Sequence, residues 1–281
     1  MGYDAKMQRV LLIVLGLLIA CPAGAQAPRR VVSFNLCADQ LVVALADPEQ
    51  IAGLSPYAAD PNLSFVADKA RAFRRIDWQA EATIALSPDL VFVGSWDRSA
   101  TRRMLRKLGF RMVELDLAPD LASARQQIGD VAAALGHPAR GEQLIAALDA
   151  ARARLDAVRL PDRTALVLER GGFTAGPDSL AATLLATAGL KPPSGAPSGF
   201  GGFLPLEKLL VLRPDLIFLK DPPAQPSDQG ALFFTHPALQ ALYPASRRIA
   251  LPTRFAMCGG PALVAAFDYL ADALARLPAS D

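Results

Sequence analysis

The sequence is poor in the side chains that most catalytic and metal sites require. It holds two histidines, His137 and His236, and each stands directly before a proline at the expected start of a helix. We therefore interpret both as structural. A Ser-His-Asp constellation, or a site for zinc or manganese, would be badly supplied. The composition predicts no catalytic residues, no metal site and no resident cofactor.

Three common functional motifs are also missing. The chain has neither the Gly-x-x-x-x-Gly-Lys-Ser/Thr loop that binds phosphates nor the Gly-x-Ser-x-Gly turn of hydrolases. The Gly171–Gly176 stretch lacks the Gly-x-Gly spacing of a dinucleotide loop. The net charge is only +2, and no basic stripe interleaved with aromatics occurs, which argues against nucleic acid as a partner.

Long hydrophobic runs are confined to the N-terminus. Two basic residues precede the apolar run Val10–Ala20, and Ala23-Gly-Ala25 fits a signal peptidase site. We expect residues 1–25 to be a signal peptide, cleaved after Ala25 or Ala27, and the mature chain to be periplasmic. The alternative is a lipoprotein anchored at Cys21, because Leu-Ile-Ala-Cys fits a lipobox. No later segment is long enough to span a membrane.

Cysteine is scarce as well, with three in the whole chain. Removal of the signal peptide leaves Cys37 and Cys258 in an oxidising compartment, where two thiols can form a disulfide. The alternative is two unrelated buried cysteines, which are common. If they pair, the bond ties the first loop of the chain to the last.

What the chain does contain is an internal repeat. The segment Glu81–Val93 and the segment Glu207–Leu219 align from either end, at a constant offset (207 − 81 = 126). Each copy predicts a short helix, a proline that ends it, and a strand that is apolar on both faces. An offset of this length indicates two lobes that are built alike.

The hydrophobic pattern predicts an α/β fold with two parallel-sheet lobes. Strands are expected at 31–34, 51–54, 90–93, 111–115, 164–168, 216–219 and 248–251, and long helices at 121–135 and 140–158. This gives an N-terminal lobe (29–118), a bridging helical segment (119–162) and a C-terminal lobe (163–281). Asp39 is expected to cap the first helix. The stretches 169–177 and 191–202 are expected to be loops.

Aromatic residues are few, yet many follow strands, where open α/β sheets bind their ligands. Collected on glycine-rich loops, they suit a large flat ligand better than a sugar or an ion. The candidate ligand-binding residues are Phe34, Asn35, Tyr57, Trp96, Arg170, Phe173, Phe203, Arg254 and Phe255.

On these motifs the chain resembles the periplasmic binding proteins of ABC importers. It is similar to the class in which one long helix bridges two α/β lobes, the receptors for cobalamin, ferric siderophores and haem. The segments that carry the likeness are the paired Glu…Leu-x-Pro-Asp-Leu copies, Arg30–Asn35, Ser55–Tyr57, Leu135-Gly136 and Gly171–Gly176. The resemblance implies a monomer that is not an enzyme, with a ligand cleft between its lobes. It would deliver a corrinoid or a ferric chelate to an ABC permease dimer in the inner membrane.

The resemblance also gives the repeated glutamates a role. In cobalamin receptors of this class, an acidic residue at each matching helix start docks onto arginines of the transporter, which implies docking by Glu81 and Glu207. The alternative is a carboxylate that stabilises its own helix by about 0.3–1 kcal/mol. Arg170 and Arg254 keep a siderophore or haem receptor open as a second function. A chelatase-like enzyme of the same architecture is the rival from another class.

Overall fold

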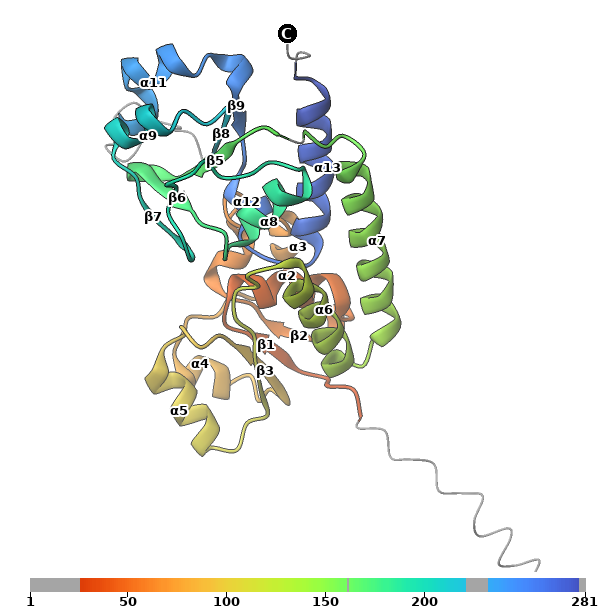
Figure 1. The fold of residues 1–281 in the computed structure, drawn as a ribbon. Helices are drawn as coiled ribbons and strands as arrows, with labels where there is room; N and C mark the ends of the chain where they lie inside the picture. The colour runs from red at the N-terminus through yellow and green to blue at the C-terminus, as the bar shows by residue number, and fades with distance from the viewer. Residues whose placement is uncertain (1–25, 161, 221–231, 278–281) are drawn as a thin grey trace, which may run out of the picture.

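The computed structural model describes residues 26–160, 162–220 and 232–277, and it has two α/β lobes stacked one above the other (Figure 1). The predicted fold class is confirmed. The expected signal peptide and the lipobox cysteine Cys21 lie outside the described residues.

The N-terminal lobe is built on a four-stranded parallel sheet in the order β2-β1-β3-β4. Its strands are β1 (Val31–Ser33), β2 (Ile51–Gly53), β3 (Leu90–Val93) and β4 (Met112–Glu114). All four residues of β3 are buried, as expected of a parallel strand covered on both faces. The helical segments of this lobe are α2 (Leu36–Leu45), η2 (Pro48–Gln50), η3 (Pro56–Ala59), α3 (Ala67–Ala70), α4 (Ala80–Ile84) and α5 (Ser99–Lys107).

The C-terminal lobe has a five-stranded sheet in the order β7-β6-β5-β8-β9. Its strands are β5 (Ala165–Leu168), β6 (Phe173–Ala175), β7 (Gly201–Phe203), β8 (Leu216–Leu219) and β9 (Arg248–Ala250). β5, β8 and β9 are parallel, whereas β6 and β7 join antiparallel. The helical segments are η4 (Arg170–Gly172), α8 (Leu180–Thr187), α9 (Leu206–Leu212), α10 (Leu232–Thr235), α11 (Pro237–Leu242), η6 (Ala245–Arg247), α12 (Thr253–Ala256) and α13 (Pro261–Ala275).

The two antiparallel strands correct the prediction of loops at 169–177 and 191–202. Their glycines, which suggested loops, instead allow the chains to approach closely. A Cβ on Gly201 would lie 2.1 Å from the carbonyl oxygen of Thr174, and one on Gly176 would lie 2.4 Å from that of Gly199. The Gly171–Gly176 motif therefore belongs to the antiparallel edge of the sheet, where β6 pairs closely with β7.

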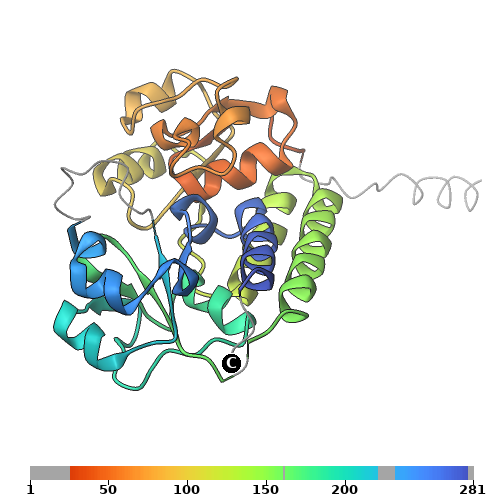
Figure 2. The same cartoon turned by 90° about the horizontal axis from the view of Figure 1, so that it is seen from above.

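The bridging segment contains two helices with different roles, α6 (Leu121–Leu135) and α7 (Pro138–Asp156). α6 packs on α2 of the N-terminal lobe, whereas α7 packs on α13 and α8. Figure 2 shows α7 on the outside of the molecule, alongside α13. Gly136 ends α6 with φ 84°. α7 then begins two residues earlier than predicted, because Pro138 is tolerated in a first helical turn.

The two repeat copies turn in the same way before their prolines. Ser87 and Arg213 both adopt φ 45° just before the proline. Asp89 then accepts hydrogen bonds from the Arg30 amide (3.0 Å) and its neighbour, and Asp215 accepts one from the Thr164 amide (2.7 Å). Because these amides directly precede β1 and β5, the repeated Pro-Asp ties one strand to the next in both lobes.

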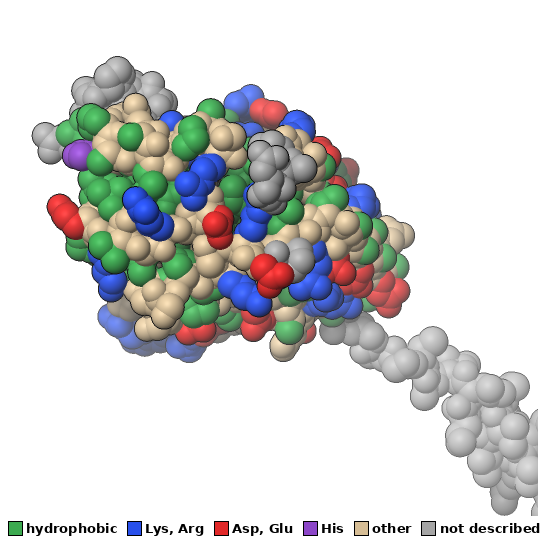
Figure 3. Space-filling view, turned by 45° about the horizontal axis from the view of Figure 1, so that its top comes forward, with side chains coloured by type: hydrophobic (Ala, Val, Ile, Leu, Met, Phe, Trp, Pro, Cys, Tyr) green, Lys and Arg blue, Asp and Glu red, His purple; other side chains and the backbone are tan. Residues whose placement is uncertain are grey.

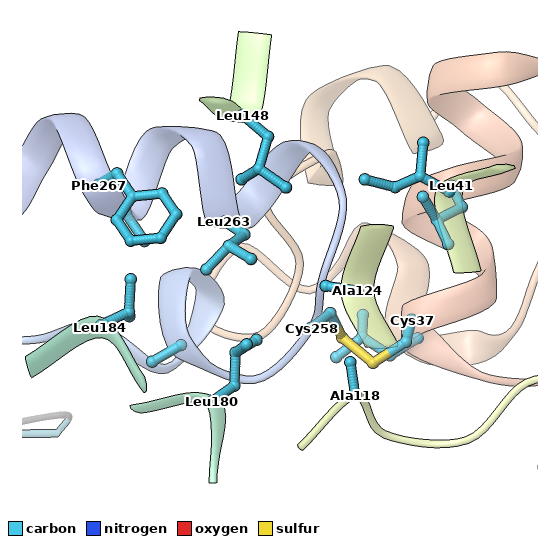
Figure 4. Close-up of a cluster of buried hydrophobic side chains, with 14 of the residues drawn as sticks. Cys37, Leu41, Ala118, Ala124, Leu148, Leu180, Leu184, Cys258, Leu263 and Phe267 are labelled. Carbon is cyan, nitrogen blue, oxygen red and sulfur yellow. A yellow bond between two sulfur atoms is a disulfide. The ribbon is translucent and has the colours of Figure 1, made fainter. Parts of the chain in front are cut away.

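One hydrophobic core runs through both lobes. It includes residues of β1, β3 and α2 in the N-terminal lobe, and of β5, α8 and α13 on the other side. We call the surface where the two lobes meet in this core the seam. Figure 4 shows Leu41 and Ala124 on one side of the seam and Leu263 and Leu180 on the other. The Cys37 and Cys258 sulfurs are bonded at 2.05 Å, with their Cα atoms 5.1 Å apart. The seam therefore has both an apolar and a covalent tie.

Asp39 is not the helix cap that was expected. The N-cap of α2 is Asn35, whose side-chain oxygen accepts from the Ala38 amide at 2.9 Å. Asn35 comes four residues earlier and is equally able to cap a helix. Asp39 instead lies fully buried inside α2.

Candidate functional site

A hollow lies at the carboxyl ends of strands in the N-terminal lobe. It has a volume of about 620 Å³ and opens beyond the ends of β1, β3 and β4. Its lining is mostly apolar: Phe34, Asn35, Leu36, Cys37, Tyr57, Leu63, Trp78, Gly94, Trp96, Asp97, Arg98, Leu115, Asp116, Leu117 and Met257.

Four of the predicted ligand-binding residues meet in this hollow. Phe34 and Asn35 directly follow β1, Trp96 follows β3, and Tyr57 lies on η3 after β2. Trp96 is 86% exposed, so its ring is available to a ligand at the rim. The topology brings these residues together because parallel strands present their carboxyl ends at one edge.

Tyr57 and Trp78 form what we call the aromatic wall of the hollow. Their ring centroids are 5.3 Å apart. The Trp78 indole donates to the carbonyl oxygen of Phe34 (3.0 Å), and the Thr101 hydroxyl donates to the carbonyl of Trp78 (2.9 Å). Arg98 lies over the Trp78 ring, 5.8 Å from its centroid. The wall is thus fixed by hydrogen bonds and by a cation–π contact.

Two carboxylates also face the hollow, and the sequence analysis did not find them. Asp97 accepts from the Gly94 amide (2.5 Å), and Asp116 accepts from the Ser95 amide (2.6 Å). Burial raises the pKa of Asp97, and the charge of Asp116 raises it further, against the hydrogen bonds from Gly94 and Asn35. Their position in the sequence could have identified them, because each aspartate comes a few residues after a predicted strand.

Three predicted residues lie on the C-terminal lobe outside this hollow. Arg170 is on η4, Phe173 begins β6 and Phe203 ends β7. The rings of Phe173 and Phe203 meet edge to face at 5.6 Å, and Phe203 is 76% exposed. Both rings therefore lie on β6 and β7, the antiparallel edge of the C-terminal sheet, whose place is shown in Figure 1.

Arg254 and Phe255, on α12, also lie outside the hollow. Arg254 lies over the Phe255 ring at 5.0 Å, and that ring contacts Phe65 (6.0 Å) and Tyr269 (5.3 Å). Phe255 therefore packs between segments of the two lobes. Met257, two residues later, is the side chain from this segment that lines the hollow.

An ion pair at the carboxyl ends of β5 and β8 was also missed. The Lys220 ammonium lies 2.9 Å from a carboxylate oxygen of Glu169, and the side chains are 13% and 29% exposed. Lys220 matches Gly94 at the repeat offset (94 + 126 = 220), and Gly94 lines the hollow of the other lobe. The repeat was therefore a signal that could have found it.

Glu81 and Glu207 lie in the first turns of α4 and α9, one on each lobe, and both are exposed. Within the described parts of the chain, neither carboxylate forms a hydrogen bond or an ion pair. Both helices lie on the side of the molecule away from α7 (Figure 1). Figure 3 shows charged side chains of both signs crowding the α7 side more densely than the opposite side.

The histidines lie at helix starts, as the sequence predicted. His137 contacts the side-chain oxygen of Gln50 at 2.9 Å, and His236 accepts from the Ala238 amide at 3.2 Å. Within residues 26–160, 162–220 and 232–277, no three His, Cys, Asp or Glu side chains cluster as metal ligands would. The same ranges hold no helix long and apolar enough to cross a membrane.

Comparison with protein families gives one match, to a periplasmic binding protein family over residues 31–247. The chain belongs to that family. A comparison with curated proteins finds no match.

Solved structures of periplasmic binding proteins share the fold. The haem-binding protein RhuT from Roseiflexus sp. RS-1 is 24% identical with a TM-score of 0.71, covering 88% of this chain and 97% of its own. A haem-binding protein from Pseudomonas aeruginosa is 21% identical with a TM-score of 0.71, covering 90% and 94%. The vitamin B12-binding protein BtuF of Vibrio cholerae is 17% identical with a TM-score of 0.68, covering 89% and 97%.

Proposed function

We propose that the protein is a periplasmic substrate-binding protein that captures a corrinoid between its lobes and delivers it to an ABC permease. Family membership supports the class of function, and solved proteins that bind vitamin B12 or haem share the fold. Capture would come mainly from burial of apolar surface, at roughly 25 cal/mol per Å².

The observation that carries the choice of ligand is the character of the hollow. Its aromatic and aliphatic lining suits a large flat ring system. Its two carboxylates, Asp97 and Asp116, oppose anionic ligands such as haem propionates or most ferric siderophores. A corrinoid instead presents neutral amides, whose N–H groups can donate to both carboxylates.

Haem is the second candidate, and Tyr57 is the observation that favours it. The ring is 47% exposed at the hollow, and a tyrosine oxygen is one of the ligands that proteins offer to haem iron. A Tyr57→Phe variant would then lose the haem absorption of a phenolate complex. Corrinoid binding would survive this change, because the ring stays in place.

The deciding experiment is a ligand titration of the mature protein from residue 26. Quenching of Trp78 and Trp96 fluorescence is followed with cyanocobalamin, haemin and a ferric hydroxamate. We expect saturable quenching by cyanocobalamin, weakened about tenfold or more when Trp96 is changed to Ala. Saturation by haemin alone would replace the corrinoid assignment, and saturation by none of the three would overturn the receptor function.

The same samples test the chelatase-like alternative. Incubation with a free porphyrin and a divalent metal ion should give no metalloporphyrin above the protein-free rate. Turnover that depends on the protein would favour the enzyme.

We also propose that Glu81 and Glu207 are the contacts that the permease reads, one on each lobe. Their exposure, their lack of partners in the described chain and their matched places in the repeat support this. Two equivalent carboxylates suit a dimeric permease, whose two subunits present the same surface twice.

A further inference from the structure

Asp39 is the one acidic side chain among the fully buried polar residues of the described chain, and it lies on α2 two residues after Cys37, which lines the hollow. One carboxylate oxygen accepts from the Ser55 amide (3.1 Å), and the other accepts from the Ser55 hydroxyl (2.5 Å). The Ser33 hydroxyl, just before the hollow residue Phe34, donates to the carbonyl oxygen of Asn35 (3.2 Å) and acts to lower the pKa of Asp39. The carboxylate therefore joins the two segments that follow β1 and β2.

Ser55 passes this contact on to the aromatic wall. Its hydroxyl oxygen accepts from the Tyr57 amide (3.3 Å) and so caps η3, the single turn that presents Tyr57 to the hollow. The Tyr57 ring in turn contacts Trp78. A continuous chain of contacts thus leads from a buried acid to the ligand-facing rings.

We propose that Asp39 is a positioning residue whose proton state sets the place of Tyr57, through Ser55, and so makes the aromatic wall sensitive to pH. The consequence for capture rests on the proposed function, but the movement of the wall does not.

The chemistry of the contact explains the sensitivity. An ionised Asp39 accepts both Ser55 donors, which leaves a lone pair of the Ser55 oxygen for the Tyr57 amide. A protonated Asp39 can itself donate to the Ser55 oxygen. The Ser55 hydroxyl hydrogen then loses its acceptor and must rotate, which redirects the lone pair that the Tyr57 amide uses. Burial raises the pKa of Asp39 to about 7, so this exchange falls in a physiological range.

The surrounding charges are compatible with this role. Asp97, beyond β3, raises the pKa of Asp39 through its negative charge. η3 contributes Tyr57, and β1 has no ionisable side chain. The ionisable side chains on α6 and α13 are exposed or already bonded elsewhere: Arg125, Asp130, Asp268, Tyr269 and Asp272.

The test uses the ligand-free protein, so it stands whether or not the ligand is a corrinoid. The chain has two tryptophans, and Trp96→Phe leaves Trp78, next to Tyr57, as the sole reporter. We expect its emission to change between pH 5 and 9 with a midpoint near 7. In the added variant Asp39→Asn, whose amide cannot titrate, the transition should disappear.

Two further variants test the link and the sign. Ser55→Ala removes the hydroxyl that connects Asp39 to the Tyr57 amide, so the pH-dependent change in Trp78 emission should shrink or vanish. Asp97→Asn removes a negative charge that raises the pKa of Asp39 and should move the midpoint to lower pH. Asp60→Asn, at the far end of η3, is the matched control and should leave it unchanged.

A transition that survives in Asp39→Asn, or no transition in the parent, would overturn the proposal. Circular dichroism identifies a variant that fails to fold. If Asp39→Asn fails to fold, the loss of the transition in Ser55→Ala and the lower midpoint in Asp97→Asn decide. A normal pH transition in a protein that binds no corrinoid would refute only the proposed function.

Discussion

Single carboxylates near strand starts hold both sheets of this protein. Asp215 shows how such a group is tuned. Partial burial acts to raise its pKa, but the hydrogen bonds from Thr164 and the charge of Arg247 outweigh burial and lower it. Asp215 therefore favours folding when it is ionised, and its contribution is lost as the pH falls through its lowered pKa.

Asp39 behaves in the opposite way, and this gives a stability prediction. Its pKa is raised from 3.8 to about 7, so the folded state holds a proton that the unfolded state releases. Its contribution to the free energy of unfolding is full below about pH 4 and is lost as the pH rises toward 7. Urea unfolding should show wild type losing about 1.4 kcal/mol per pH unit relative to Asp39→Asn across this window. Asp60→Asn serves as the control, and parallel profiles for wild type and Asp39→Asn would contradict the prediction.

At the residue scale, the sequence predicted side chains whose place follows from topology alone. Phe34 and Asn35 directly follow a strand, so any parallel sheet brings them to the hollow. Asp97 and Asp116 were missed because their direction depends on turns that close only in the folded chain. Phe255 lies on α12, and its ring contacts Phe65 outside the hollow, which the sequence pattern did not predict.

At the scale of elements, the repeat is a device for ending a helix sharply and starting a strand. Ser87 and Arg213 adopt a left-handed conformation, which costs an L-residue roughly 1–2 kcal/mol. In both copies the residue at this position is left-handed, and it turns the chain from the helix into the Pro-Asp pair that anchors the strand. The backbone strain at Ser87 and Arg213 therefore accompanies the sharp turn between helix and strand in each copy.

This strain predicts that glycine stabilises both positions. Ser87→Gly and Arg213→Gly should each raise the free energy of unfolding by up to about 1 kcal/mol, because glycine adopts positive φ without a steric cost. The urea midpoint measures the gain. Lys107→Gly, in the right-handed helix α5, should instead cost about 1 kcal/mol. Destabilisation at both repeat positions would show that their side chains outweigh the strain.

The sequence predicted β3, β5 and β8 well because each is a short, fully apolar and buried run. β6 and β7 were missed because their stability comes from pairing with each other and not from local propensity. Gly201 and Gly202 make up most of β7, and glycine is a poor strand former.

At the scale of the whole molecule, the shared core and α7 restrict how the lobes can move. A loop hinge absorbs large backbone changes, whereas a packed helix bends only slightly. The core that runs from α2 to α13 would have to open for the lobes to separate. We therefore expect a ligand to cause only small movements of the residues around the hollow.

The Cys37–Cys258 bond makes a second prediction at this scale. Replacing both cysteines by alanine should lower the free energy of unfolding by about 2–5 kcal/mol, because the bond closes a very long loop. Urea unfolding measures the loss. Free-thiol counting on the denatured mature wild type should find none, and two reactive thiols would contradict the bond.

The docking proposal belongs to the same scale, because it concerns two lobes at once. Glu81→Lys with Glu207→Lys should abolish uptake through the permease and leave ligand affinity unchanged, since both carboxylates lie outside the hollow. Uptake by cells and tryptophan quenching by cyanocobalamin measure the two properties. The matched control reverses two exposed carboxylates on α7 and α13, Glu142 and Asp272. If the control lost uptake equally, the loss would come from the change in net charge and not from docking by Glu81 and Glu207.

The disulfide also imposes an order of events in time. The chain emerges from its N-terminus, so Cys37 appears early and its partner comes 221 residues later, just before the last helix. Cys37 must stay reduced, or be protected, until nearly the whole chain is present. Formation of the bond is then a late event, and a chain truncated before Cys258 would leave Cys37 as an unpaired thiol beside the hollow.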